Sequence, residues 1–128
     1  SNFTLQICTK GVYIVAISDK EKKIRKETKR LKSIFQDLDA NKLETVDALI
    51  ARAAYITITL QELEEDLNLE GWVEEYQNGR NQSGLKKSAK AEVHISLTKN
   101  LNAIMKQLLD LVPPAKKAES KLQAMMAG

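Results

Sequence analysis

Basic side chains are the residues whose number and spacing most favour a chemical role, and that role is phosphate binding. Between Asp19 and Ser33 there are eight basic and three acidic residues, a local net charge of +5. Each cation that contacts a phosphate releases a counterion, so such a run suits a nucleic-acid backbone. A solvated amphipathic helix with local ion pairs explains the same run without a ligand. The candidate contacts are Lys20, Lys22, Lys23, Arg25, Lys26, Lys29, Arg30 and Lys32.

A second basic cluster lies further along the chain. From Arg80 to Lys90 there are four basic residues and no acidic ones: Arg80, Lys86, Lys87 and Lys90. Lys90 falls in the first turn of an expected helix, where the macrodipole disfavours a cation, and this hints at an external partner. From Gln61 to Glu75 there are seven acidic residues and no basic ones, which favours a solvated acidic face. Because no compact helix-turn-helix is evident, we expect contacts to the DNA backbone rather than to bases.

Residues for catalysis or metal binding are scarce. His94 is the single histidine and has no second ligand at zinc-site spacing. Cys8 is the single cysteine, which fits a reducing cytoplasm. No phosphate-binding glycine loop is present, and no apolar run is long enough to span a membrane. We therefore expect no enzyme, cofactor, metal site or membrane contact, and a place in the cytoplasm.

The elements that would carry these residues are helices. Charged residues make up 29% and aromatic residues 5% of the chain, which favours an all-α fold. Ser18 followed by Glu21, and Asn41 followed by Glu44, are capping-box patterns that predict the first two helices. Gly71 ends the second helix. A third helix runs from Ser88 to the proline pair that begins at residue 113, and packs against the second as a long antiparallel hairpin.

The remaining segments complete the expected organisation. Residues 3–17 alternate in a strand pattern and predict a short β-strand or hairpin. Residues 72–77 add one more helical turn, and residues 78–87 form a mobile loop. A short helix lies within residues 115–127. We expect three parts: a strand-like or flexible segment at 1–17, a helical domain at 18–112 and a C-terminal helical tail at 113–128.

An ordered series of motifs runs along the chain from about Asn41 onward. It begins with the long helix Leu49-Ile50-x-x-Ala53-Ala54-x-Ile56-x-x-x-Leu60-x-x-Leu63, followed by Gly71 and the turn Tyr76-Gln77-Asn78-Gly79. It ends with Lys86-Lys87-Ser88-Ala89 and the helix end Lys106-Gln107-Leu108-Leu109-Asp110-Leu111-Val112-Pro113. Together these motifs resemble those of the terminase small subunits of tailed bacteriophages. Asp110 and Val112 stand where that family has Gly and Thr.

This resemblance implies a non-catalytic adaptor for phage DNA packaging. Such a subunit forms a homo-oligomer, binds double-stranded viral DNA and engages the large terminase subunit. Independently, Ile50 and Leu60 lie on a different stripe from Leu49 and Ile56, which also predicts a homo-oligomer. The alternative is a helical protein–protein interaction module, or a phage-encoded regulator without nucleic-acid function. That module would use the acidic run or the alanine-rich helix face.

Overall fold

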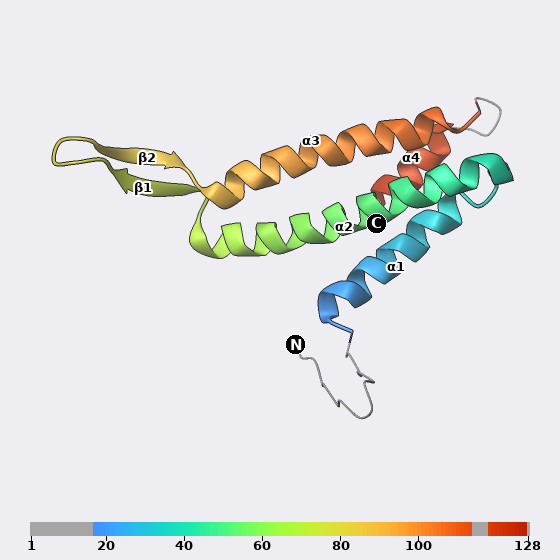
Figure 1. The fold of residues 1–128 in the computed structure, drawn as a ribbon, viewed down its shortest axis with the longest axis horizontal. Helices are drawn as coiled ribbons and strands as arrows, with labels where there is room; N and C mark the ends of the chain where they lie inside the picture. The colour runs from blue at the N-terminus through green and yellow to red at the C-terminus, as the bar shows by residue number, and fades with distance from the viewer. Residues whose placement is uncertain (1–16, 114–117, 128) are drawn as a thin grey trace, which may run out of the picture.

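The structure, a computed structural model, describes residues 17–113 and 118–127 of the chain. Within these ranges it contains four helices and one antiparallel pair of strands (Figure 1). Their order is α1 (Asp19–Ile34), α2 (Ala40–Glu70), β1 (Val73–Gln77), β2 (Ser83–Lys87), α3 (Ala89–Asp110) and α4 (Ala118–Met126). The expected strand or hairpin at residues 3–17 lies almost wholly outside the described residues.

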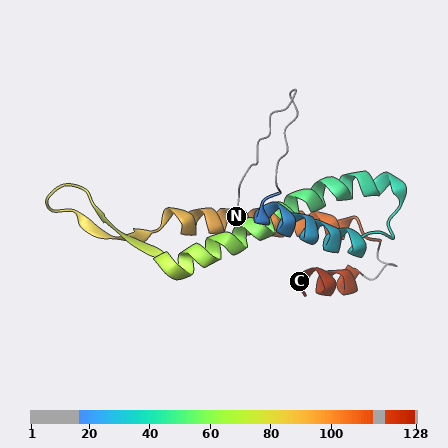
Figure 2. The ribbon, with the colours of Figure 1, turned by 90° about the horizontal axis from the view of Figure 1, so that it is seen from below.

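The long helix α2 is the centre of the fold. It packs against α3 on one side, forming the predicted antiparallel hairpin, and against α1 on the other (Figure 1). The short helix α4 contacts both α1 and α3 and lies against one side of this three-helix layer (Figure 2). The two apolar stripes of α2 are therefore both covered within one chain: Ile50, Ile56 and Leu60 are buried and Leu49 is half-buried. The two apolar stripes on α2 therefore give no independent support for the predicted homo-oligomer, because no second copy is needed to cover them.

One apolar cluster joins all four helices. Leu31 and Phe35 come from α1 and its C-cap, Ile50 from α2, Leu108 from α3 and Met125 from α4, and each is at most 3% exposed. Burying a side chain of this size contributes about 1.5–3 kcal/mol relative to leaving it in water. Since α4 supplies Met125 to this cluster, the predicted C-terminal helix is part of the core.

Two of the predicted helix starts are confirmed and one is wrong. The hydroxyl of Ser18 accepts a hydrogen bond from the Glu21 backbone N–H (3.1 Å), and the hydroxyl of Ser88 accepts one from the Ala91 N–H (3.0 Å). Asn41 does not cap α2, which begins at Ala40. The carbonyl of Asp39 already accepts the N–H groups of residues 42 and 43, so the helix starts before Asn41 is reached.

The predicted end of α2 is confirmed at Gly71. Its φ of +91° lies in a region that favours glycine, and its N–H donates to the carbonyl of Leu67 (2.8 Å). At the other end of the hairpin, α3 ends at Asp110, just before the prolines that were expected to stop it.

The segment after Gly71 differs from the sequence prediction. Instead of a helical turn and a mobile loop, β1 and β2 form a two-stranded ribbon that projects from the end of the α2–α3 hairpin (Figure 1). Val73 pairs with Lys87 and Gln77 with Ser83. Non-local pairing between β1 and β2 outweighs the helical preference of the Glu and Gln residues in β1. The all-α expectation is therefore wrong at this point, although the fold remains mostly helical.

Two backbone hydrogen bonds close the ribbon. Asn78 N–H donates to the carbonyl of Gln82 at the tip (2.6 Å), and Ser88 N–H donates to the carbonyl of Trp72 at the base (3.0 Å). In the five-residue loop between the strands, Gly79 takes a φ of +76°, which a side chain would disfavour. The register of the ribbon is thus fixed at both ends.

Candidate nucleic-acid interface

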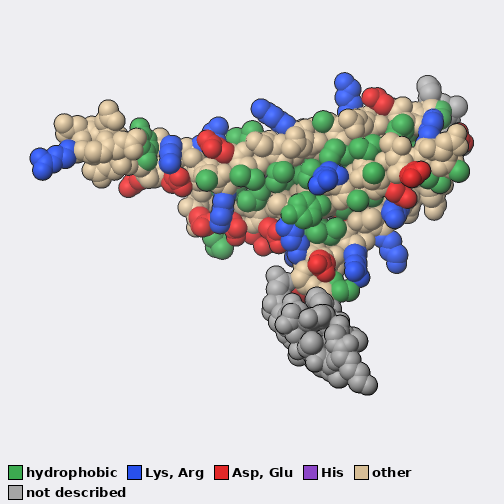
Figure 3. All heavy atoms as spheres, viewed as in Figure 1, with side chains coloured by type: hydrophobic (Ala, Val, Ile, Leu, Met, Phe, Trp, Pro, Cys, Tyr) green, Lys and Arg blue, Asp and Glu red, His purple; other side chains and the backbone are tan. Residues whose placement is uncertain are grey.

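The outer face of α1 is the largest group of unpaired cations in the described structure. We define this face by five exposed residues spaced three and four apart: Lys22, Arg25, Lys26, Lys29 and Lys32. Residues at that spacing share one side of a helix. No hydrogen bond or ion pair joins any of them to another described residue. Figure 3 shows Lys and Arg side chains projecting from the edge of the molecule that α1 forms.

Core packing explains why this face points outward. Ile24, Leu31 and Phe35 lie on the opposite side of the helix, where Leu31 and Phe35 are buried against α2 and Ile24 is half-buried. Burial of that stripe leaves the cations no orientation except toward solvent. Along the outer face, residues 25, 26, 28, 29 and 32 line a shallow surface hollow. From residue 22 to residue 32 the face extends about 15 Å at 1.5 Å per residue. Lys23 is also exposed and unpaired among the described residues, but it lies beside this face.

Lys20 belongs to the protein's internal contacts rather than to the outer face. Its ammonium lies 2.9 Å from the carboxylate of Glu62 and 4.8 Å from the centre of the Tyr55 ring, both on α2. These contacts tie the first turn of α1 to the middle of α2. A phosphate would have to compete with a carboxylate for this cation.

Arg30 also has an internal role. Its guanidinium binds the Glu27 carboxylate at 2.6 and 3.0 Å, and this pairing raises the pKa of Arg30. It also donates to the carbonyls of Ala124 (2.9 Å) and Met125 (3.1 Å) in the last turn of α4. Cations bound to the last carbonyls of a helix stabilise its C-terminal end. Arg30 therefore helps to hold the end of α4 against α1.

A reciprocal contact runs from α4 to α1. The ammonium of Lys121 donates to the carbonyl of Ile34 (2.6 Å), at the end of α1, and to the carboxylate of Asp37 (2.8 Å). Each of these two helices thus supplies a cation to the C-terminal end of the other. Sequence reasoning did not identify Lys121, since residues 34 and 121 are far apart in the chain.

The second basic cluster is divided by the fold. Arg80 lies in the loop at the tip of the ribbon, while Lys90 lies on α3 beyond its base. Lys86 pairs across the ribbon with Glu74 (3.4 Å). Arg80 and Lys87 are exposed and have no hydrogen bond or ion pair within the described ranges. The four residues therefore do not form one phosphate-binding surface.

Lys90 has partners inside the chain, which corrects the sequence interpretation. Its ammonium lies 2.7 Å from Glu70 and 3.2 Å from Asp66, two carboxylates at the end of α2. These hydrogen bonds raise the pKa of Lys90. The unfavourable position of the cation near the start of α3 is offset by these carboxylates, so it gives no sign of an external ligand.

Much of the acidic run contacts lysine and histidine side chains of the same chain. Glu62 binds Lys20, Asp66 and Glu70 bind Lys90, and the carboxylate of Glu64 lies 2.9 Å from Nε2 of His94. His94 also meets the indole of Trp72 edge-on, with ring centres 5.2 Å apart. His94 therefore has partners within the fold. Among the described residues no group of three or more His, Cys, Asp or Glu is placed to hold a metal, and Cys8 lies outside them.

The ribbon exposes apolar side chains that sequence reasoning missed. Trp72, Val73, Tyr76 and Leu85 are between 37% and 70% exposed, and nearby Leu69 is 89% exposed. Residues 73–76 read Val-Glu-Glu-Tyr and do not alternate between apolar and polar, so this segment carries no clear strand pattern. These five make up half of the large apolar residues exposed in the described structure.

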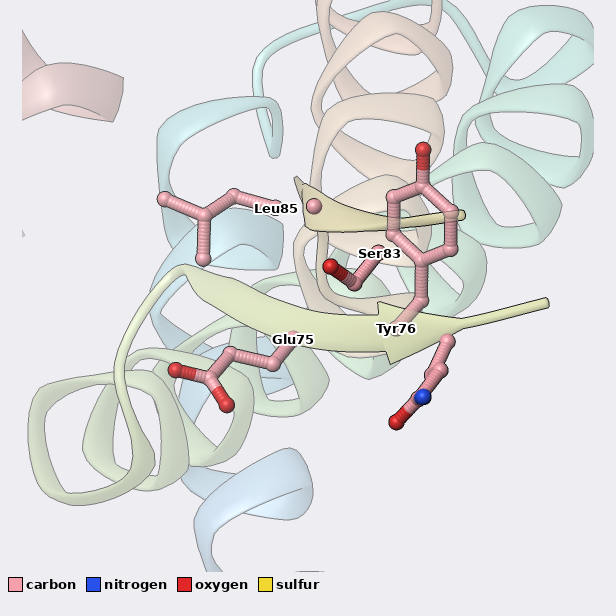
Figure 4. Close-up of a pocket in the computed structure, with 6 residues that line it drawn as sticks. Glu75, Tyr76, Ser83 and Leu85 are labelled. Atoms are coloured by element: carbon pink, nitrogen blue, oxygen red, sulfur yellow. The ribbon is translucent and has the colours of Figure 1, made fainter. Parts of the chain in front are cut away.

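Figure 4 shows the middle of the ribbon. A shallow pocket there is lined only by the two strands, through Glu75, Tyr76, Gln77, Ser83, Gly84 and Leu85. The Tyr76 ring lies across Gly84, where an added Cβ would come within 3.1 Å of a ring carbon. Tyr76 and Leu85 point to different sides of the ribbon (Figure 4). The pocket is therefore an open protein surface without catalytic side chains converging on it.

Comparison with protein-family models, with curated proteins and with solved structures gives no match for this chain. In the described part of the chain, none of the helices combines the length and apolar character that crossing a membrane requires.

Proposed function

We propose that this protein is a non-catalytic DNA-packaging adaptor of the terminase small subunit type. In this role it binds double-stranded DNA through the outer face of α1, assembles as a homo-oligomer and engages a large terminase subunit in the cytoplasm of a bacterial host. The proposal rests on the sequence resemblance and on one structural observation. That observation is the set of five cations on α1 that face solvent without an ion pair to a described carboxylate, although Lys22 acts electrostatically on Asp19.

The distribution of paired and unpaired cations supports a phosphate ligand at α1. Lys20, Arg30 and Lys90 each meet a carboxylate of the chain, whereas the outer face does not. Unpaired lysines and arginines can give their full counterion release to phosphates. Because backbone contacts carry no sequence information, we expect weak sequence preference, with dissociation constants of about 10⁻⁴ to 10⁻⁶ M per protomer at physiological salt.

The alternative of a protein–protein interaction module would use the acidic run or the alanine-rich face, and both are partly engaged within the chain. Glu62, Glu64 and Glu70 of the acidic run contact Lys20, His94 and Lys90. On α2, Ala53 and Ala54 are buried against neighbouring helices. The exposed apolar side chains of the ribbon favour contact with a protein surface.

Two matched variants test the proposal. The face variant carries Arg25→Gln, Lys29→Gln and Lys32→Gln on α1. The control variant carries Arg52→Gln, Lys99→Gln and Lys106→Gln, which removes the same residue types from exposed positions of α2 and α3. All six side chains lack partners among the described residues, so we expect both variants to fold.

The measurement is affinity for duplex DNA in low salt. We expect the face variant to bind at least about tenfold more weakly than the unmodified protein, since three phosphate contacts are lost. The control variant should stay within about threefold, because net charge alone has a smaller effect than lost contacts. Equal affinity of both variants would remove α1 from the proposal, and absence of any binding by the unmodified protein would favour the protein-binding alternative.

A further inference from the structure

The ribbon has little support from the rest of the described chain. None of its ten strand residues is buried, and only Gly84 is partly covered. A two-stranded ribbon is marginally stable in water unless further strands or a packed face support it. This one also carries exposed Val73, Tyr76 and Leu85. A partner surface would stabilise the ribbon and cover these side chains.

Within the described ranges, neither edge of the ribbon pairs with a third strand, so either edge can accept one. The backbone hydrogen bonds between Trp72 and Ser88 and between Asn78 and Gln82 show which residue pairs along the two strands are hydrogen-bonded. In an antiparallel pair, hydrogen-bonded and non-bonded residue pairs alternate. The non-bonded pairs are therefore 73 with 87, 75 with 85 and 77 with 83, and their backbone N–H and C=O groups point outward. Such unpaired edges are templates for strand addition.

Charge is divided between the two edges. β1 carries Glu74 and Glu75 and no basic residue, while β2 carries Lys86 and Lys87 and no acidic one. Like charges directly opposite each other destabilise a strand pair, and opposite charges stabilise it. Pairing of β1 with β1 would bring four carboxylates together, and pairing of β2 with β2 would bring four ammonium groups together. Pairing of β1 with β2 of another copy avoids both repulsions and places carboxylates beside ammonium groups.

From this division we infer that the ribbon is the contact between copies of this chain, with β1 of one protomer added to β2 of the next. Ribbons that project in the same direction make these two strands antiparallel. The register seen within the chain then places Glu74 opposite Lys86 of the partner subunit. It also places Val73 diagonal to Leu85 of the partner subunit, on one face of the sheet.

The contact is of the head-to-tail type. Each protomer uses its acidic strand on one side and its basic strand on the other, which generates a closed ring or an open filament. The inference deepens the proposed function and rests on it for the role of the assembly. The contact itself is tested without DNA.

A charge-exchanged chain provides the test. It carries Glu74→Lys, Glu75→Lys, Lys86→Glu and Lys87→Glu, so the opposite charges within its own ribbon are retained. Each kind of chain should assemble with itself. Mixed contacts should fail, because β1 of one kind and β2 of the other then carry like charges. The ribbon is expected to fold in both chains, so loss of mixed contacts reports on the interface.

The measurement is native mass spectrometry of both chains purified separately, dissociated, mixed in equal amounts and reassociated, with a heavy-isotope label on one. We expect separate oligomers of each chain, with mixed species at least about tenfold rarer than random mixing gives. Random mixing would overturn the inference, because the ribbon would then lie outside the contact. Preferential mixed assembly would overturn it in favour of β1–β1 and β2–β2 pairing, and a 14.4 kDa protomer at tens of micromolar would do so as well.

The face variant distinguishes a failure of the ribbon contact from a failure of DNA binding through α1. It leaves the ribbon unchanged, so it should assemble like the unmodified protein while binding DNA weakly. An assembled protein that binds no DNA would contradict only the proposed function. A protomer that binds DNA without assembling would contradict the ribbon contact and the homo-oligomer, and would leave the proposed DNA binding standing.

Discussion

The ammonium of Lys90 lies 2.7 Å from the carboxylate of Glu70, across the point where the α2–α3 hairpin opens into the ribbon. Glu70 is the last residue of α2, and Lys90 lies in the first turn of α3. Together with Asp66, this contact holds the two helix ends close beneath the strands. The base of the ribbon is thus defined by charge pairing as well as by the bond between Ser88 and Trp72.

This pairing predicts a stability difference that depends on pH. The carboxylates raise the pKa of Lys90 above its ordinary 10.5, so the folded state favours the protonated amine. The stabilisation is fully present below the pKa of the unfolded chain and is lost as pH rises through the folded value. Lys90→Gln should lower the unfolding midpoint at neutral pH, and the gap should begin to narrow as pH rises past 10.5, toward the raised pKa of Lys90. Thermal unfolding between pH 7 and pH 11 checks this.

The matched change for that experiment is Lys99→Gln. Lys99 is exposed on the same helix and has no partner within the described ranges. Its loss should leave the unfolding midpoint nearly unchanged throughout the pH series. A gap of the same size and pH dependence for both variants would show that the loss of any lysine, and not the contact with Glu70, is responsible.

The role of α4 in the core gives a second prediction. Met125 is 3% exposed and its neighbour Met126 is 73% exposed. Met125→Ala should lower the free energy of unfolding by about 2–5 kcal/mol, because it removes buried contacts and leaves a cavity. Met126→Ala should stay within about 0.5 kcal/mol of the unmodified protein. Urea unfolding measures both, and equal effects would contradict the placement of α4.

A third prediction concerns hydrogen exchange in the ribbon. The backbone N–H groups of Tyr76 and Gly84 point toward the opposite strand, whereas those of Glu75 and Leu85 point outward. In the assembled protein both sets should be protected, because the outward groups bond to the neighbouring ribbon. In dilute protomer only the inward set should retain protection. Outward amides that exchange rapidly in an assembled sample would contradict pairing between copies.

The features that sequence reasoning predicted are the ones determined locally. Ser18 and Ser88 cap helices because a hydroxyl can reach an N–H three residues ahead. Gly71 ends α2 because its conformation is disfavoured for other residues. The apolar stripe of α1 follows from helical periodicity alone. Each of these depends on residues within one or two helical turns, so no knowledge of the fold is needed.

The features that it missed depend on distant partners. The ribbon exists because Val73 pairs with Lys87, and neither segment alone has a strong strand pattern. Among the candidate cations, Lys20 is paired with Glu62 and Lys90 with Glu70. Nothing near either lysine in the sequence distinguishes it from Lys26, which has no such partner. The candidate interface could therefore be predicted as a helix but not residue by residue.

The salt dependence of DNA binding tests the central claim most directly. Each phosphate contact adds about 0.9 to the steepness of the plot of log affinity against log salt concentration. If Arg25, Lys29 and Lys32 each contact a phosphate, the slope for the face variant should be shallower by about 2–3 than that of the unmodified protein. The control variant should change it by less than about 1. Identical slopes for the unmodified protein and the face variant would contradict DNA binding through the outer face of α1.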